Sequence, residues 1–171
     1  MHGVLAVLRA ATVMALCAYG AAGAQPPGPA QAGLEARLAQ AQSDARLAES
    51  LLKTGRKAAA FCANCHGDSG NSIKPEVPNL AGQNTAYLLE QLQQFADGRR
   101  RDTFMQSMIH AMSADEKVGA VLYYASQKVA SRPPPPETLL ATGRDVFAKV
   151  CVRCHGNEGR GDHKIARIAG Q

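Results

Sequence analysis

Apolar residues recur at steps of three and four along most of the chain, and this spacing predicts helices. A weakly amphipathic stretch runs from residue 34 to 52, and a clearer one runs from 86 to 97. Ser113 and Glu116 stand at the spacing of a capping box, which opens a further helix through Gln127. The fold class expected from this pattern is therefore all-α.

Proline-rich segments separate the helical stretches. Residues 25–50 begin with a loose leader rich in Pro and Gly and continue as a helical extension. Four consecutive prolines make residues 131–137 a stiff, extended linker. We therefore expect one domain at 51–130 and a further segment at 138–171.

The segment after the linker repeats the one before it. Residues 143–148 repeat 55–60, and Ile-Ala-Gly-Gln at 168–171 repeats Leu-Ala-Gly-Gln at 80–83, both at an offset of 88. Self-similarity of this kind indicates an internal duplication. A helix is expected to start at Gly55, the first residue of the first repeat, and to carry the motif described next.

Two Cys-x-x-Cys-His motifs lie inside the repeat and are the strongest chemical signal. They comprise Cys62, Cys65 and His66 in the first copy and Cys151, Cys154 and His155 in the second, at an offset of 89. Two thiols three positions apart on a helical turn lie along one edge of a flat macrocycle, where each adds to a vinyl group as a thioether. The histidine that follows offers a neutral imidazole nitrogen to the iron. The sequence therefore predicts covalent haem (heme) c at the first motif and a second haem at the other.

The cysteine pairs have other conceivable uses. Four thiolates in two pairs suit a structural zinc site, and one pair alone suits a thioredoxin-like redox centre. A zinc site gives no reason for a histidine after both pairs, however, and a thioredoxin motif follows a strand, whereas these flanks are helical in pattern. Haem attachment is the interpretation that accounts for all six residues.

The first 24 residues have the pattern of a cleaved secretory signal. A short apolar run at 10–19 follows Arg9, and the small residues Ala22, Gly23 and Ala24 precede Gln25. The run is too short to span a bilayer, so no transmembrane segment is expected after cleavage, although a retained N-terminal anchor is the alternative. A periplasmic location follows from this interpretation.

Charge is modest, with a formal net value of +5, and is mixed along the chain apart from Arg99, Arg100 and Arg101. Aromatic residues are not interleaved with these arginines, which argues against nucleic acid as a partner. Such a basic run near a haem edge steers an acidic redox partner, or it is simply a solvated loop.

The motifs together resemble the cytochrome c4 and c553 type of class I cytochromes c. The residues that carry the resemblance are Cys62–Gly67, Pro78–Gln83, Tyr87–Leu92, Phe95–Gly98, Met105 and the helix that reaches Tyr123, Tyr124 and Ala125. The likeness covers 51–130 fully and 138–171 in part. It implies a cytochrome c-like haem domain followed by an incomplete second one, in a di-haem electron carrier of the respiratory chain.

The resemblance also implies a methionine opposite the histidine. Residues 99–112 lack regular apolar spacing and contain Met105, Met108 and Met112. In the family the ligating methionine lies seven residues before an apolar position, and Met112 occupies that position here. Met105 is therefore the expected ligand, and Met108 is the alternative. Pro78 matches the family proline whose carbonyl accepts a hydrogen bond from the ligating imidazole. Such His/Met ligation leaves no open iron position and suits electron transfer rather than catalysis.

The second unit departs from the family. Its 34 residues are fewer than the roughly 40 that usually fold alone, and no methionine follows His155. We expect a fragment of a longer di-haem protein, with a naturally incomplete second site as the alternative, in which His163 acts as a ligand. Otherwise His163, like His110, is expected as an exposed loop histidine.

The expected function is single-electron transfer to larger redox proteins or membrane oxidase and reductase complexes, without enzymatic activity. Its rivals are a haem subunit of a multi-subunit dehydrogenase, a peroxidase-like di-haem enzyme with an open second iron, and a haem-based sensor.

Overall fold

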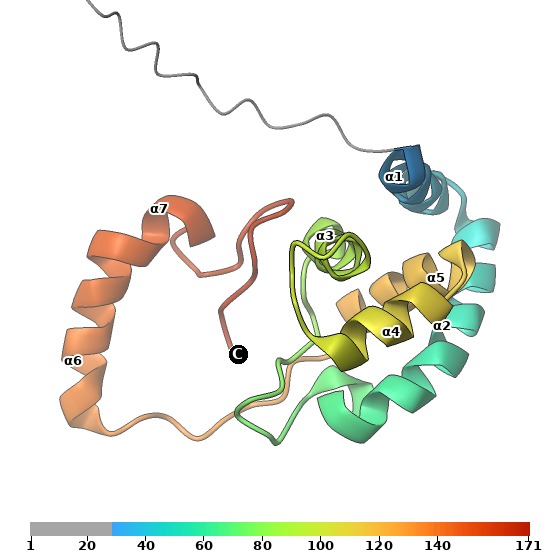
Figure 1. Ribbon diagram of the computed structural model, residues 1–171. Coiled ribbons are helices and arrows are strands. Elements are labelled where there is room, and N and C mark those ends of the chain that lie inside the picture. The colour runs from blue at the N-terminus through green and yellow to red at the C-terminus, as the bar shows by residue number, and fades with distance from the viewer. Residues whose placement is uncertain (1–28) are drawn as a thin grey trace, which may run out of the picture.

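The computed structural model describes residues 29–171 (Figure 1). Over this range the secondary structure is helical and contains no strand, which confirms the expected all-α class. The helices are α1 (Pro29–Ser43), α2 (Ala45–His66), α3 (Thr85–Ala96), α4 (Thr103–Ala111), α5 (Ala114–Ala125), α6 (Glu137–Val146) and α7 (Val152–His155), with a 3₁₀ turn η1 (Asp68–Gly70) and a π-helical turn η2 (Phe147–Cys151). The expected signal at 1–24 lies outside the described residues. None of the described helices is long and apolar enough to cross a membrane.

The first predicted helical stretch is in fact two helices that meet at Asp44. Its side chain accepts hydrogen bonds from the backbone N–H groups of Arg46 and Leu47, at 2.9 and 3.2 Å, and so starts α2 at Ala45. The expectation that the haem-bearing helix begins at Gly55 is therefore wrong. A side-chain cap, and not the repeated glycine, marks the start of this helix.

Gly55 instead lies at the crossing of α2 and α5. A Cβ atom on Gly55 would overlap the backbone of Gly119, and one on Gly119 would overlap the carbonyl of Leu51. The two glycines thus let the helix backbones touch. The core around this crossing consists of Leu38, Ala41, Leu51, Ala59, Leu88, Leu89, Val118, Val121 and Tyr124.

Helix α4 occupies the region where the sequence has no regular apolar spacing. Its start depends on Asp102, whose carboxylate accepts the N–H of Met105 at 2.8 Å. Helix α5 begins with the predicted capping box, in which the N–H of Ser113 donates to Glu116 at 2.8 Å and the N–H of Glu116 donates to the Ser113 hydroxyl at 3.3 Å. Both caps fix the ends of helices that line one cavity.

We call residues 51–130 the first unit and 138–171 the second unit. In the second unit the loop after the cysteine motif repeats the backbone hydrogen bonds of the first. The N–H of Leu80 donates to Gly70 and that of Ile168 to Gly159, each at 2.8 Å. By contrast, none of the residues of α6, η2 or α7 is buried. The local path of the chain is duplicated, whereas its burial is not.

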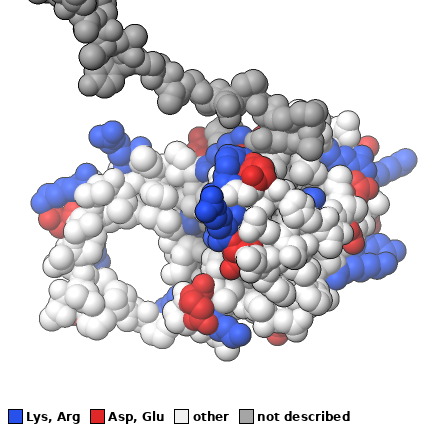
Figure 2. All heavy atoms as spheres, viewed as in Figure 1, with Lys and Arg blue, Asp and Glu red and all other residues white. Residues whose placement is uncertain are grey.

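The two units touch through loops. The side chain of Asn71 holds the chain that leaves α5, donating to Lys128 at 3.0 Å and accepting from the N–H of Ala130 at 2.8 Å. Val129 of this chain then lies against both units. A Cβ atom on Gly82 would stand 2.7 Å from one Val129 methyl group, and a Cβ atom on Gly170, the equivalent residue of the second unit, would stand 2.9 Å from the other. Figure 2 shows an open hollow that is ringed by α6, α7, the C-terminal loop and the linker (Figure 1), with positive and negative side chains interspersed on this face.

Candidate haem-binding site

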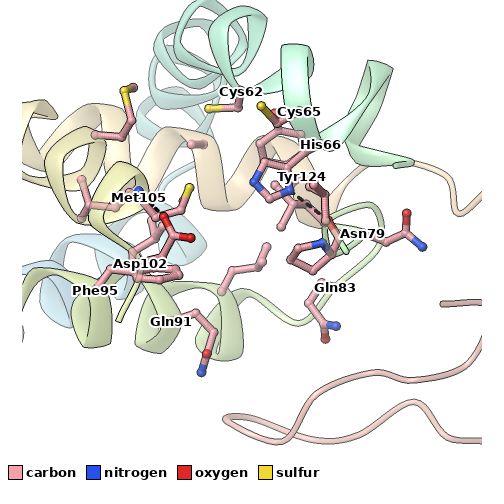
Figure 3. Close-up of a pocket in the computed structure, with 18 of the residues that line it drawn as sticks. Cys62, Cys65, His66, Asn79, Gln83, Gln91, Phe95, Asp102, Met105 and Tyr124 are labelled. Atoms are coloured by element: carbon pink, nitrogen blue, oxygen red, sulfur yellow. Dashed lines mark hydrogen bonds between the residues drawn. The ribbon is translucent and has the colours of Figure 1, made fainter. Parts of the chain in front are cut away.

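A cavity of about 700 Å³ lies between the end of α2, the loop after it, α3, α4 and α5 (Figure 3). Cys62, Cys65 and His66 line it from α2, and Met105 lines it from α4. The cavity thus brings together the first haem motif and the expected methionine, which are about 40 positions apart in the sequence.

The two thiols differ in their surroundings. Cys62 is half-buried and Cys65 is exposed, and both are free. Burial raises the pKa of the Cys62 thiol, although the neighbouring Tyr124 hydroxyl opposes the rise by hydrogen bonding. Tyr124 itself is buried, with its hydroxyl 3.3 Å from the carbonyl oxygen of Ala59, and burial also raises its pKa. The cysteines therefore stand at the edge where the cavity opens to solvent.

His66 is 8% exposed, and its Nδ1 lies 2.9 Å from the carbonyl oxygen of Pro78 (Figure 3). A carbonyl oxygen only accepts hydrogen bonds, so Nδ1 carries the proton in this contact. The lone pair then resides on Nε2, the nitrogen available to a metal. The loop at Pro78 thereby selects one tautomer and one ring orientation.

All three methionines of the region line the cavity, namely Met105, Met108 and Met112. Met105 and His66 lie on facing sides of it (Figure 3). The backbone of Met105 is held by the Asp102 cap, so its position in the first turn of α4 is well defined. Ligation by Met105, with Met108 as the alternative, stays a prediction.

The residues present fit a covalent haem. The cavity has the volume of a site for a bound organic group, two thiols at one edge, an imidazole Nε2 on one side and a thioether sulfur on the other. Within residues 29–171 no three His, Cys, Asp or Glu side chains gather into a metal site. The four described cysteines are also free of disulfides.

The arginine run has partners within the first unit. Arg99 forms ion pairs with Glu90 at 2.9 Å and Asp97 at 2.7 Å. Arg100 donates to Gln91 at 2.6 Å and stacks on Phe95 at 4.7 Å from the ring centroid. Arg101 remains exposed at the cavity edge. Two of the three arginines expected to face an acidic partner thus stabilise the first unit.

The second motif has the same local geometry without the same surroundings. Cys151 is half-buried, Cys154 is exposed, and Nδ1 of His155 lies 2.8 Å from the carbonyl oxygen of Ala166. Ala166 stands where Pro78 stands in the first unit, and the contact is kept because a backbone carbonyl makes it. None of the three motif residues lines the cavity described above.

Of the other described histidines, neither His110 nor His163 lines the cavity. His110 is exposed in the last turn of α4, so its expected place in a loop is wrong, because the Asp102 cap makes this segment helical. His163 is exposed with a φ of 45°, and its ring lies 3.6 Å from the Asp162 carboxylate.

Sequence reasoning missed the cavity wall that the second unit supplies. Ala166, Arg167, Ile168 and Gln171 line the first cavity. The repeated Ala-Gly-Gln pattern was the available signal, since Gly82 and Gly170 both lie against Val129. A repeat in the sequence does not show that the loop of the second unit packs against the cavity of the first.

Comparison with known proteins decides the family. The cytochrome c profile matches residues 52–124, which span α2 to α5. Cytochrome c-554(548) of Halomonas halodenitrificans is 33% identical over 70 residues, a match that covers 84% of that protein and 39% of this chain. This chain belongs to the cytochrome c family. Its cofactor is accordingly covalently bound haem c with its iron.

Within this family the cytochrome is similar to cytochrome c4, as its motifs predicted. Cytochrome c4 of Pseudomonas aeruginosa is 35% identical over 115 residues, which cover 63% of this chain and only 57% of that protein. The thiosulfate dehydrogenase electron acceptor of Thiomonas intermedia is 35% identical over 109 residues, covering 57% of this chain and 50% of the relative. The crystal structure of reduced cytochrome c4 from Pseudomonas stutzeri superimposes with a TM-score of 0.61 at 29% identity, covering 68% of this chain and 70% of that one.

Proposed function

We propose that this cytochrome transfers single electrons through haem c attached at Cys62 and Cys65. The observation that carries the proposal is the cavity in which His66 and Met105 face each other beside the two thiols. When bound, the haem would supply a one-electron iron couple, attached at Cys62 and Cys65 and ligated by His66 and Met105. With both ligands bound, the iron would have no position left for a substrate.

The surrounding residues suit this task in three ways. The Pro78 carbonyl fixes the His66 imidazole so that Nε2 points to the cavity. A methionine sulfur favours the ferrous state and raises the potential. Packed side chains such as Leu88 and Val121 exclude water and limit rearrangement between oxidation states. These features support electron transfer over catalysis.

We also propose a second haem at Cys151 and Cys154 with His155 as its axial ligand. The equivalent contact of His155 with Ala166 supports this, because it prepares the same tautomer as in the first unit. The division into a signal at 1–24, an extension at 25–50, two haem units and a linker at 131–137 belongs to the same proposal, as does a periplasmic location.

The proposed partners are larger redox proteins or membrane oxidase and reductase complexes. The likeness to a thiosulfate dehydrogenase electron acceptor supports an enzyme complex as the donor. Phe61 and Phe104, which are 53% and 55% exposed at the cavity edge, offer the apolar contact that a redox partner covers. Exposed Arg101 beside them favours an acidic partner surface.

The test replaces Met105 by Ala in the haem-loaded protein, with Met108→Ala as the matched control. Met105→Ala should abolish the sulfur-to-iron charge-transfer band, lower the midpoint potential and allow carbon monoxide to bind the ferrous haem. Met108→Ala should keep the band and exclude carbon monoxide. An unchanged spectrum and potential in Met105→Ala would contradict the ligand assignment, and rapid peroxide turnover by the unaltered protein would favour the peroxidase-like alternative.

A further inference from the structure

The second unit is fastened to the first by side chains near the start of α3. The side-chain amide of Gln83 makes two hydrogen bonds with the backbone of Arg167. Its Nε2 donates to the Arg167 carbonyl oxygen at 2.9 Å, and its Oε1 accepts from the Arg167 N–H at 2.6 Å. Asn84 donates to the carbonyls of Arg160 and Ile165 at 3.1 and 2.9 Å. Asn84 is the N-cap of α3, yet its side chain makes no capping bond and serves this contact instead.

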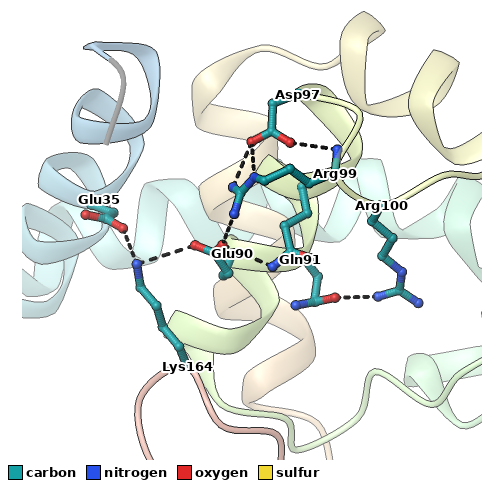
Figure 4. A network of polar contacts seen from close by, with 8 residues as sticks. Glu35, Glu90, Gln91, Asp97, Arg99, Arg100 and Lys164 are labelled. Atoms are coloured by element: carbon teal, nitrogen blue, oxygen red, sulfur yellow. Dashed lines mark hydrogen bonds and ion pairs between the residues drawn. The ribbon is translucent and has the colours of Figure 1, made fainter. Parts of the chain in front are cut away.

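Lys164 completes the attachment by reaching between two carboxylates (Figure 4). Its Nζ lies 2.9 Å from Glu35 of α1 and 3.4 Å from Glu90 of α3. Glu90 is only 10% exposed in its side chain and is also paired with Arg99. We call the contacts made by Gln83, Asn84 and Lys164 the inter-unit latch.

The latched loop is also a wall of the first cavity. Ala166, Arg167 and Ile168, which follow Lys164 closely in sequence, line the cavity together with His66 and Met105. Asn84 and Lys164 themselves do not line it. The latch therefore holds the wall from outside the site, and moving the loop would admit water on this side.

We propose that Lys164 and Asn84 are positioning residues of the first haem site, because they hold the second-unit loop as its wall and so set its exposure to water. This inference rests on the proposed haem function. Exclusion of water disfavours the more charged ferric state, and the guanidinium of Arg167 near the cavity acts in the same direction. A closed latch thus raises the potential of the first haem.

The test is Lys164→Glu in the full-length, haem-loaded protein. An exposed ion pair adds little when merely removed, whereas a glutamate here would face Glu35 and Glu90 and repel the loop. Lys149→Glu is the matched control, since Lys149 of η2 lies in the same unit, pairs with Asp145 at the end of α6 at 2.6 Å, and undergoes the same change of charge. Double variants with Asn84→Ala should strengthen the effect.

Two measurements separate the latch from the haem. Hydrogen exchange of the Arg167 amide, which donates to Gln83, should accelerate about tenfold or more in Lys164→Glu and remain unchanged in Lys149→Glu. The midpoint potential of the sulfur-ligated haem should fall further in Lys164→Glu than in Lys149→Glu. Adding Glu35→Lys to Lys164→Glu should restore part of both effects.

Unchanged hydrogen exchange at the Arg167 amide in Lys164→Glu would overturn the inter-unit latch. Faster exchange at Arg167 together with a midpoint potential equal to that of Lys149→Glu would overturn the proposal that the loop sets the potential of the first haem. Intact mass without haem on Cys62 and Cys65 would contradict the proposed function instead, and the exchange measurement would still report on the latch.

Discussion

The two units follow the same path through the helix, the cysteine motif and the loop, but only the first packs that path into a core. Leu51 is 1% exposed, whereas Leu139, its equivalent at an offset of 88, is 59% exposed. Even so, His66 and His155 keep the same contact with a loop carbonyl, at 2.9 and 2.8 Å. The geometry of the motif is therefore set by local backbone hydrogen bonds and not by burial of the helix.

The largest expected contrast comes from Leu51→Ala and Leu139→Ala. Removing the buried Leu51 side chain leaves a cavity beneath α5 and should lower the free energy of unfolding by about 2–5 kcal/mol. The exposed Leu139 should change it by less than about 0.5 kcal/mol. Urea denaturation of the haem-loaded protein measures both, and equal losses would contradict the assigned burial.

Gly55→Ala and Gly143→Ala test the helix crossing. The methyl group on Gly55 meets the Gly119 backbone and should cost about 1–3 kcal/mol, because the helices must separate. No atom lies within 4 Å of a Cβ on Gly143, so Ala there should be neutral or stabilise α6 by about 0.5–1 kcal/mol. Thermal unfolding compares the pair, and a tolerated Gly55→Ala would show that α2 and α5 are not in backbone contact.

Helix capping is also unequal, since α5 begins with a capping box and α6 begins after Pro136 without a side-chain cap. Ser113→Ala should reduce the free energy of unfolding by about 1 kcal/mol. Ser107→Ala is the control, because the Ser107 hydroxyl only donates back to Thr103 within α4 at 2.9 Å, and it should have an effect below about 0.5 kcal/mol. Equal values from chemical denaturation would mean that the box does not stabilise α5.

The smallest expected effect concerns pH at the place where the units meet. Burial alone would raise the pKa of Glu90, but hydrogen bonds from Gln94 and Arg99 and the nearby Lys164 together lower it. A carboxylate with a depressed pKa stabilises the fold above its unfolded pKa, and this stabilisation is lost as the pH falls through the folded value.

Below about pH 4.5 the Glu90→Gln variant should therefore lose less of its free energy of unfolding than the unaltered protein does, and the difference should be less than about 1 kcal/mol. Exposed Glu49 on α2 supplies the control variant Glu49→Gln, which should follow the unaltered protein. Acid titration of the unfolding midpoint is the measurement, and identical curves for Glu90→Gln and the unaltered protein would rule out the contribution of Glu90.

Sequence reasoning succeeded where local rules determine structure. The spacing of apolar residues located α3 and α5, and the pair Ser113 and Glu116 located the start of α5 correctly. It failed at Asp44 and Asp102, whose capping action depends on a backbone conformation that spacing does not reveal. In both places an aspartate stands directly before the first residue of the helix, a signal that a stricter search for caps would have found.

The candidate site was less accessible to such reasoning. The first motif and the cluster of methionines were visible in the sequence, because covalent attachment needs a fixed local spacing. The internal partners of Arg99 and Arg100, and the wall formed by Arg167, depend on how distant segments pack. Tertiary contacts of this kind have no periodicity along the chain.

The π-helical turn η2 coincides with one of the two places where the repeats differ in length. Gly143 precedes Cys151 by eight positions, whereas Gly55 precedes Cys62 by seven. A π turn accommodates one additional residue within a helix, and here it spans Phe147–Cys151. The additional residue of the second copy is thus absorbed within one turn of its helix. The loop after the motif compensates, because His66 precedes Pro78 by twelve positions whereas His155 precedes Ala166 by eleven, and the contact between imidazole and carbonyl is kept in both copies.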